Sequence, residues 1–275
     1  MINIREKTIA YCVLTLGAII AIYPLISIVN LSLTSRSSNP QMDHEFLGIY
    51  LGNYVEAWQR GAFNRAMISS IFVSSCVVLL TLFCAILAGY AFALMRVPFA
   101  KTILALLLFG LVMPYEGIVI SLYEMMDSLH LLNTYWALIL PQVALSMPFA
   151  VLWLRTFFST VPKSIIESAN LDGASRMQSL RFILVPLAKS AIGTLATLLF
   201  LFTWNEFLLA LVLVPSNSGI QTVPLSLSFF AGNRRNSEPP VTAAAAVLVA
   251  LPVVFAYLFL QRRLIRGIIS GAVKE

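Results

Sequence analysis

The segment Val161–Leu187, VPKSIIESANLDGASRMQSLRFILVPL, is polar and charged in a chain that is otherwise mostly apolar. Asp172-Gly173 predicts a turn at a helix end, because glycine readily takes a positive φ there. Ser175 is a candidate cap for a second helix, and Pro186 is expected to end that helix. The segment therefore predicts two short helices joined by a tight turn.

The composition around this segment is that of a membrane protein. Hydrophobic residues make up 59% of the 275 residues and charged residues 11%, whereas soluble proteins have about 25% charged residues. Apolar runs of about 18 or more residues recur, long enough to cross a hydrocarbon layer of roughly 30 Å as helices. We predict an all-α integral membrane protein with one transmembrane domain over residues 1–275. Its six transmembrane helices are expected at about 8–33, 64–94, 102–122, 135–154, 189–214 and 241–260, followed by a tail over 261–275.

The distribution of basic residues predicts the orientation. Six spans place both termini on one side, and that side carries all but five of the 18 lysines and arginines. The five on the other side are Arg36, Arg60, Arg65, Arg234 and Arg235. By the positive-inside rule, both termini and the segment 161–187 are expected to be cytoplasmic.

Several classes of function are disfavoured by what the sequence lacks. No glycine is followed by lysine, so there is no Walker A phosphate loop. His44 and His130 have no paired nucleophile, and no catalytic residue is assigned. Cys12, Cys76 and Cys84 lie in apolar runs without a CxxC pair, which predicts packing and no metal site. Basic residues at the ends of apolar runs indicate membrane orientation, not nucleic-acid binding.

Periodicity alone leaves two interpretations of the segment 161–187 open. The short helix pair has too little apolar surface to be a domain, so it is expected to dock in a groove of a partner protein. Alternatively it is an interfacial loop whose Lys and Arg side chains contact lipid headgroups. The same lipid interpretation applies to the basic tail after Leu260.

The residues of this segment resemble the EAA signature of permease subunits of bacterial ABC importers. The signature, roughly EAA-x-x-DGA followed by I-x-LP, is matched in letters and in the interval from glycine to proline. The matching residues are Glu167-Ser168-Ala169, Asp172-Gly173-Ala174-Ser175 and Ile183-Leu184-Val185-Pro186-Leu187. Ser168 and Val185 depart from the usual alanine and leucine by small changes in size.

Further motifs resemble the carbohydrate-uptake branch of this family, similar to the second permease of maltose-type and trehalose-type systems. They are Trp204-Asn205-Glu206-Phe207, Thr222-Val223-Pro224, Gln261-Arg262-Arg263 and Ser270-Gly271-Ala272-Val273-Lys274. The resemblance implies a type I importer fold and ATP-driven import of a sugar. A phosphorylated substrate would favour a basic path, which the spans lack, so an uncharged di- or oligosaccharide is favoured.

The resemblance also implies partners and residue roles. A second permease, two ATP-binding subunits and an extracytoplasmic substrate-binding protein are expected, with ATP and Mg bound by the partner ATPase and no cofactor in this chain. Gly173 would allow the tight turn, Glu167 would meet a basic group of the ATPase, and Lys274 would lie near the interface of the ATPase subunits. The residues expected to couple to the ATPase are Glu167, Ser168, Ala169, Asp172, Gly173, Ala174 and Pro186.

Candidate residues for the transport path lie in the fifth span. Glu206 lies about 17 residues past Lys189, roughly 25 Å along a helix, in the outer part of that span. Residues 204, 205 and 206 are about 100° apart around a helix and cannot all face one cavity. We expect Asn205 and Glu206 to line the path and Trp204 to pack or gate; alternatively Glu206 simply reaches the outer interface.

Three further alternatives are kept. Tyr115, Glu116, Tyr123 and Glu124 form a cluster that is assigned to the aromatic belt in preference to a surface for a substrate-delivering protein. An ion-coupled secondary transporter usually needs buried charges and an internal repeat, and here Glu206 is the only clear charge within a span. An importer of glycerol phosphate or of an amino sugar also stays an alternative.

Overall fold

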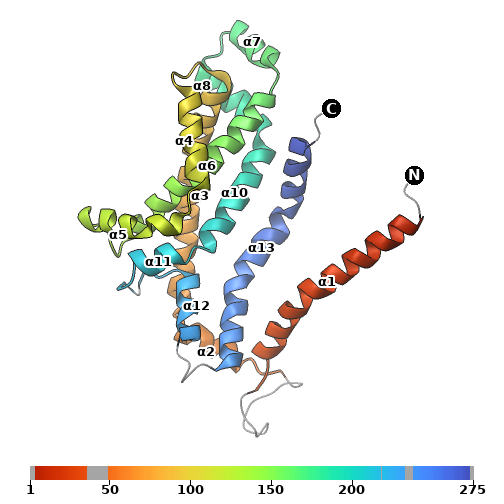
Figure 1. The fold of residues 1–275 in the computed structure, drawn as a ribbon, viewed down its shortest axis with the longest axis vertical. Helices are drawn as coiled ribbons and strands as arrows, with labels where there is room; N and C mark the ends of the chain where they lie inside the picture. The colour runs from red at the N-terminus through yellow and green to blue at the C-terminus, as the bar shows by residue number, and fades with distance from the viewer. Residues whose placement is uncertain (1–3, 36–48, 218, 233–237, 273–275) are drawn as a thin grey trace. The chain divides into compact units, whose positions relative to one another are not determined.

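Figure 1 shows the computed structural model of the chain, which describes residues 4–35, 49–217, 219–232 and 238–272. Every regular element within these ranges is a helix. The predicted all-α fold class is confirmed. Contacts divide the chain into two compact units, Met1–Asn64 with Ser226–Pro252 and Arg65–Leu225 with Val253–Glu275, and each is described by itself.

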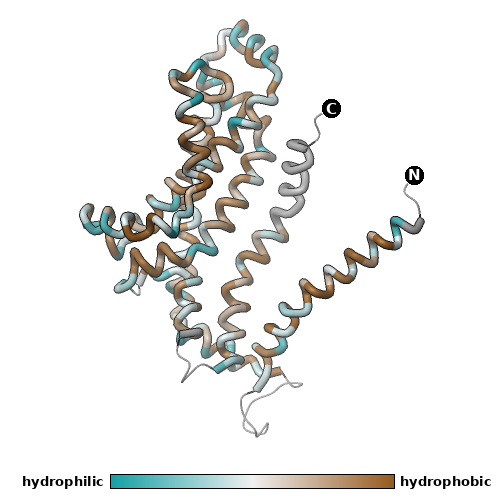
Figure 2. Tube along the Cα trace, in the orientation of Figure 1, coloured by the Kyte–Doolittle hydropathy of each residue, from teal (hydrophilic) through white to brown (hydrophobic). Residues whose placement is uncertain are grey.

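The first unit contains α1 (Ile4–Ser32), α2 (Gly52–Arg60) and the beginning of α13 (Pro239–Ala272). Helix α1 is mostly apolar after a charged first turn, as Figure 2 shows. None of the most apolar part of α1 is buried in this chain. Such a helix is stable only in lipid or against a partner, because exposed apolar surface is unfavourable in water.

Asn53 joins α2 to the end of α1. The sequence suggests Asn53 as the cap of the short helix, but the structure buries it inside α2. Its Nδ2 donates to the carbonyl oxygens of Ser32 at 2.9 Å and Thr34 at 3.0 Å. The hydroxyls of Ser32 and Tyr54 are also 2.6 Å apart. The capping prediction was wrong because α2 begins at Gly52, which places Asn53 within the first turn of the helix.

The second unit is built around α3 (Phe63–Leu94), α4 (Ala100–Val112), α6 (Tyr135–Thr160) and α10 (Lys189–Trp204). Helix α6 packs against both α4 and α10. Its Pro141 and Pro148 are both buried, and the helix continues through both of them. Neighbouring helices therefore surround the places where proline removes a backbone hydrogen bond.

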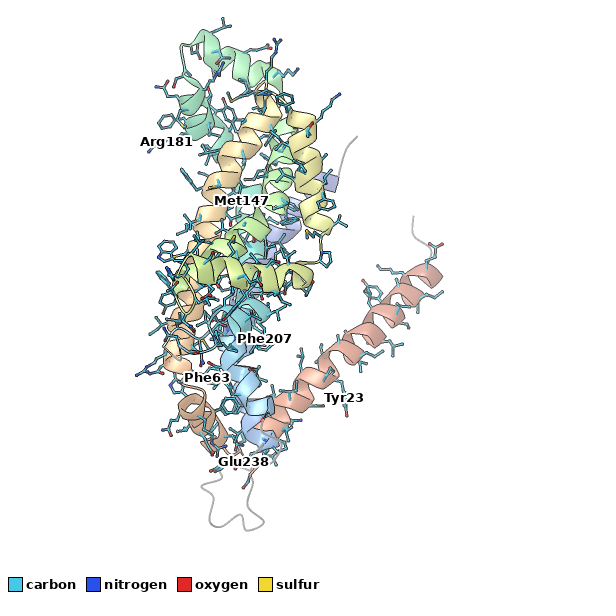
Figure 3. The ribbon with its side chains drawn as sticks, turned by 60° about the vertical axis from the view of Figure 1, so that its left-hand side comes forward. Tyr23, Phe63, Met147, Arg181, Phe207 and Glu238 are labelled. Carbon is cyan, nitrogen blue, oxygen red and sulfur yellow. The ribbon has the colours of Figure 1, made fainter. Side chains whose placement is uncertain are left out.

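Two clusters of buried side chains form the interior of the second unit. The junction cluster consists of Val73, Val77, Met126, Ala137, Leu138, Ile139, Leu209, Ala210, Leu213, Val214 and Leu225. The coupling-side cluster consists of Ala85, Tyr90, Ala150, Val151, Leu154, Phe158, Leu180, Leu184, Ala188, Leu195 and Leu199. Figure 3 labels Met147 on α6, which packs on the coupling-side cluster.

Four helices in the described ranges are long and apolar enough to cross a membrane, and six spans result if each of two bent pairs counts as one. The first pair joins Ala100–Val112 to Tyr115–Ser128 with a bend of 92°. The second joins Arg176–Leu187 to Lys189–Trp204 with a bend of 76°. The count reaches the predicted six only when both bent pairs are counted, and the second pair includes part of the segment 161–187.

The structure corrects three details of the prediction. The expected span 189–214 is not one helix, because α10 ends at Trp204 and α11 (Leu208–Leu213) begins after a break. The expected tail is helical through Ala272 as a continuation of α13. Cys76 packs on a cluster of buried side chains as expected, whereas Cys12 and Cys84 are exposed in this chain.

Candidate functional site

The coupling element, Val161–Leu187, begins with α7 (Lys163–Leu171) and turns at Gly173. Gly173 has φ +81°, a conformation that side chains rarely adopt. The N–H of Gly173 donates to the carbonyl of Asn170 at 3.1 Å, and that of Ala174 donates to Ala169 at 2.9 Å. This pair of bonds is a Schellman motif, which satisfies the last carbonyl groups of α7. The predicted conformation of Gly173 is confirmed.

The second helix of the coupling element starts with a capping box. The Ser175 hydroxyl accepts from the N–H of Gln178 at 3.3 Å, and the N–H of Ser175 donates to Oε1 of Gln178 at 2.7 Å. The cap predicted at Ser175 is thus confirmed, and Gln178 completes it. Helix α8 (Arg176–Gln178) follows directly.

A π-helical segment, Ser179–Leu184, continues α8 and runs into α9 (Val185–Leu187). The N–H of Val185 donates to the carbonyl of Leu180, five residues earlier. Pro186 was expected to end this helix, but the helix continues through Leu187. Proline is tolerated here because it lies in the first turn of α9, where its missing N–H leaves little unsatisfied. The direction changes only at Ala188, before α10.

The coupling-side cluster holds the coupling element against α3, α6 and α10. Leu180 and Leu184 are buried in it, and Ile166 of α7 packs on it. The Tyr90 hydroxyl on α3 donates to the carbonyl of Arg176 at 3.4 Å. Figure 1 shows α7 and α8 together at one end of the second unit. A force applied to this end therefore reaches three membrane helices through packed side chains.

The residues predicted to couple to an ATPase do not share one environment. Glu167, Ser168, Asp172, Gly173 and Pro186 are exposed. Ala174 is half-buried, and Ala169 is buried at 6% exposure. Ala169 therefore supports the packing of α7, while the charged members of the set face outward.

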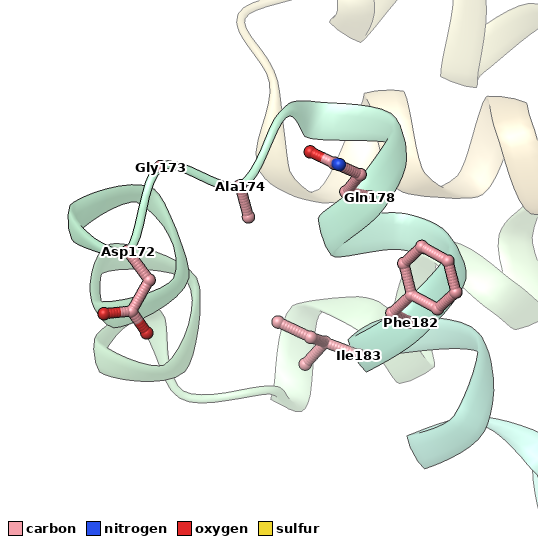
Figure 4. Close-up of a pocket in the computed structure, with 6 residues that line it drawn as sticks. All are labelled: Asp172, Gly173, Ala174, Gln178, Phe182 and Ile183. Carbon is pink, nitrogen blue, oxygen red and sulfur yellow. The ribbon is translucent and has the colours of Figure 1, made fainter.

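The coupling element also exposes apolar side chains that the sequence analysis did not assign. Leu171, Met177 and Phe182 are 89%, 61% and 66% exposed. An open cleft of about 310 Å³ lies between the two helices, lined by Asp172, Gly173, Ala174, Gln178, Phe182 and Ile183 (Figure 4). Apolar residues in so short and polar a segment are the signal that could have identified this surface.

The predicted path residues lie where α10 ends. Trp204 is buried at 1% exposure, with its ring 5.5 Å from that of Phe200. Asn205 is exposed, and its Nδ2 donates to the carbonyl of Leu201 at 2.7 Å. Glu206 is half-buried, and its Oε1 accepts from the N–H of Leu209 at 2.9 Å. Because α10 ends at Trp204, the 100° spacing around one helix that was assumed for residues 204, 205 and 206 does not apply. Trp204 packs as expected.

A second helix break, in the third span, lies next to the break between α10 and α11. The third span is interrupted at Met113-Pro114, followed by the 3-10 turn η1 (Tyr115–Ile118) and α5 (Val119–Ser128). Tyr115 packs on the junction cluster. Helix α5 packs against α11, and Figure 3 marks Phe207 at the α10–α11 break. We call these two breaks together the helix junction.

No group of three or more potential metal ligands occurs in the part of the chain that the structure describes. Lys274, expected near the ATPase interface, lies outside the described residues. The two candidate sites of this chain are therefore the coupling element and the helix junction.

Residues 46–270 match the family model described as "Binding-protein-dependent transport system inner membrane component". The chain belongs to this family. It is a permease subunit of an ABC importer, and the family is a membrane component of such systems that does not itself catalyse a reaction. A membrane location with several apolar helices agrees with this assignment.

Relatives of this permease match along nearly the whole chain. The trehalose transport permease SugB of Mycobacterium tuberculosis is 31% identical, with 92% of this chain and 93% of that protein covered. The trehalose/maltose transport permease MalG of Thermococcus litoralis is 30% identical, with 98% and 99% covered.

A chain in the crystal structure of a bacterial ABC transporter that imports the acidic polysaccharide alginate has a similar fold. The TM-score is 0.76 at 22% identity, with 95% of this permease and 98% of that chain covered. The type I importer fold that the EAA resemblance implied is confirmed by this match.

Proposed function

We propose that this permease imports an uncharged di- or oligosaccharide and that its coupling element receives the ATP-driven movement of a cytoplasmic ATPase. The permeases named above that transport trehalose and maltose support the substrate class. The absence of Lys and Arg from residues 102–154 and 190–233 supports an uncharged substrate over glycerol phosphate. Family membership disfavours the ion-coupled alternative.

The observation that carries the coupling role is the pair of locally capped short helices on the coupling-side cluster. Exposed Glu167 and Asp172 flank an apolar surface that suits a protein groove better than lipid headgroups. The proposed assembly contains a second permease, two ATP-binding subunits and an extracytoplasmic binding protein. ATP and Mg bind to the ATP-binding subunits, and Lys274 lies near their interface.

The proposed orientation has both termini and the coupling element in the cytoplasm. Glu167, Ser168, Asp172, Gly173, Ala174 and Pro186 face the ATPase, and Ala169 supports them from within. A cysteine at Lys163 is expected to react with a membrane-impermeant thiol reagent only from the cytoplasmic side. Labelling of that cysteine from outside intact cells would overturn the orientation.

Gly173→Pro tests the coupling role most directly. Proline fixes φ near −65° and has no N–H, whereas Gly173 has φ +81° and donates to Asn170. In proteoliposomes containing the whole transporter, we expect at least about a tenfold loss of trehalose or maltose uptake and of the ATP hydrolysis that the binding protein stimulates. The assembled complex should still purify, because Gly173 is exposed.

Glu167→Ala is the matched variant on the same helix. An exposed ion pair contributes only about 0–1 kcal/mol, so uptake should fall by no more than about fivefold. Normal uptake by the Gly173→Pro variant would overturn the coupling role. A larger loss from Glu167→Ala than from Gly173→Pro would show that charge, not the turn, dominates the contact.

A further inference from the structure

Asn133 joins two parts of the second unit that lie far apart in sequence. It lies between α5 and α6, and its N–H donates to the carbonyl of Leu213, the last residue of α11, at 3.0 Å. Its Oδ1 accepts from the N–H of Ser216 at 3.0 Å, and its carbonyl accepts from Nδ2 of Asn217 at 3.1 Å. We call these four residues the asparagine clasp. It connects the end of α5 to the end of α11.

The backbone of Asn133 has a conformation that few residues adopt. Its φ is +58°, in the left-handed region, which asparagine visits more readily than most other residues with a side chain. Such a conformation persists only where the surrounding structure over-determines it. Here the N–H of Leu131 donates to the carbonyl of Met126 at 2.9 Å, and the Thr134 hydroxyl donates to the carbonyl of Leu131 at 2.6 Å. The loop is therefore held in shape by its own bonds as well as by the clasp.

Apolar packing accompanies the clasp. Helix α5 packs against α11. Met126 of α5 and Leu213 of α11 are both buried in the junction cluster, and Leu131 and Leu132 pack on that cluster. Close-packed side chains transmit a displacement instead of absorbing it. The two helices are thus joined by packing and by hydrogen bonds at the same end.

Neither α5 nor α11 is joined to the preceding part of its span by a continuous helix. The pair Ala100–Val112 and Tyr115–Ser128 is bent by 92°, and α11 follows α10 only after the break at residues 205–207. A few residues at the ends of such elements can absorb large changes in φ and ψ. A helix that follows a break is therefore held mainly by what it packs on, and for α5 the packing partner is α11.

We infer that Asn133 is a positioning residue for transport, which ties α5 and α11 into one body that keeps its internal contacts while the transporter changes conformation. This inference rests on the proposed function, because it supposes an ATP-driven cycle. It assigns no contact with the sugar to Asn133, which acts by holding two helices in one arrangement. Separate movement of the helices would break all three bonds of the clasp.

Hydrogen exchange tests whether the clasp stays closed. The transporter, purified with its partner subunits, is compared at rest and trapped with ATP and vanadate, and exchange is followed at the backbone N–H groups of Asn133 and Ser216. We expect both groups to exchange at least about a hundredfold more slowly than in an unstructured chain, in both states. Fast exchange of either group in one of the two states would show that the helices separate and would overturn the inference.

Asn133→Gly keeps the positive φ and the backbone groups but removes the side-chain bond to Ser216. We expect exchange of the Ser216 N–H to become at least about tenfold faster, because the clasp opens more often. In proteoliposomes the maximal uptake rate should fall about fivefold, while the half-saturating concentration of the binding protein loaded with trehalose or maltose changes by less than about twofold. Such a split indicates a slower conformational step, not weaker docking.

Two further variants serve as controls. Asn133→Asp keeps an acceptor oxygen and also tolerates a positive φ, so it should retain at least about half of the maximal uptake rate and the slow exchange of Ser216. Ser128→Ala removes a hydroxyl that bonds to the carbonyl of Met125 within α5, and it should change neither measurement. An unchanged maximal uptake rate in Asn133→Gly, or an Asn133→Asp chain as impaired as Asn133→Gly, would contradict the inference.

The proposed function can fail independently of this result. Hydrogen exchange requires no sugar, so an open clasp in a transporter that still imports trehalose would refute only the role of Asn133. A closed clasp in a transporter that imports neither trehalose nor maltose would refute only the substrate class.

Discussion

The coupling element and the helix junction both interrupt helices of the second unit, yet they are held in place differently. In the coupling element the bonds are local: Gly173 with Asn170, Ala174 with Ala169, and Ser175 with Gln178. At the junction the bond of Glu206 to Leu209 is local too, but the packing of α5 on α11 joins segments far apart in sequence. A locally closed element keeps its shape when its surroundings move, as a part that transmits force must. A junction held by distant contacts changes when its neighbours move.

The largest effect expected from this comparison is that of Trp204→Ala. Trp204 is 1% exposed and its ring lies against Phe200, so truncation leaves a cavity at the end of α10. We expect a loss of about 3–5 kcal/mol in the free energy of unfolding, measured by SDS titration of the purified complex. Asn205→Ala removes only an exposed side chain with a local bond and should change it by less than about 0.5 kcal/mol. Similar costs for both variants would mean that the junction is not held by burial.

Gly89→Ala tests the packing beneath the coupling element. A Cβ at Gly89 would lie 3.0 Å from Leu154 Cβ and 3.1 Å from the backbone nitrogen of Arg155, where α3 and α6 approach closely. Backbone cannot move as easily as a flexible side chain, so we expect a cost of about 1–3 kcal/mol in the same titration, with reduced uptake. Gly110→Ala is the control, since its Cβ would meet Pro148 at an ordinary 3.6 Å. An equal change in the free energy of unfolding for Gly89→Ala and Gly110→Ala would show that α3 and α6 can move apart to accommodate the added methyl group.

The sequence predicts the coupling element well because its structure is local. Asp172-Gly173 and Ser175 carry their conformations within a few residues, and the apolar runs give the number of spans. The break after Trp204 was missed because residues 194–214 contain no glycine or proline. What ends α10 is the cap that Glu206 provides to Leu209, which competes with continuing the helix.

The packing of α5 on α11 could not be predicted from periodicity. The two helices lie in separate spans, and only tertiary contacts bring them together. Asn53 was misassigned because α2 begins one residue before it and its amide bonds to the end of α1. Contacts between segments far apart in sequence override local propensity in both cases.

The smallest changes in the free energy of unfolding are expected for two serines of the coupling element. Ser175 accepts from the N–H of Gln178 in the capping box, and its loss should cost about 1 kcal/mol in the free energy of unfolding. The hydroxyl of Ser168 bonds to the carbonyl of Ser164, one turn back in the same helix, so Ser168→Ala should change the free energy of unfolding by less than about 0.5 kcal/mol.

Gln178→Ala should cost nearly as much unfolding free energy as Ser175→Ala, and the double variant should cost less than the sum because both residues serve one motif. Additive costs, or a cost for Ser175→Ala as large as that for Trp204→Ala, would mean that the coupling element depends on distant contacts after all. The local closure inferred for it would then be wrong, and force would have to reach α10 through the π-helical segment alone.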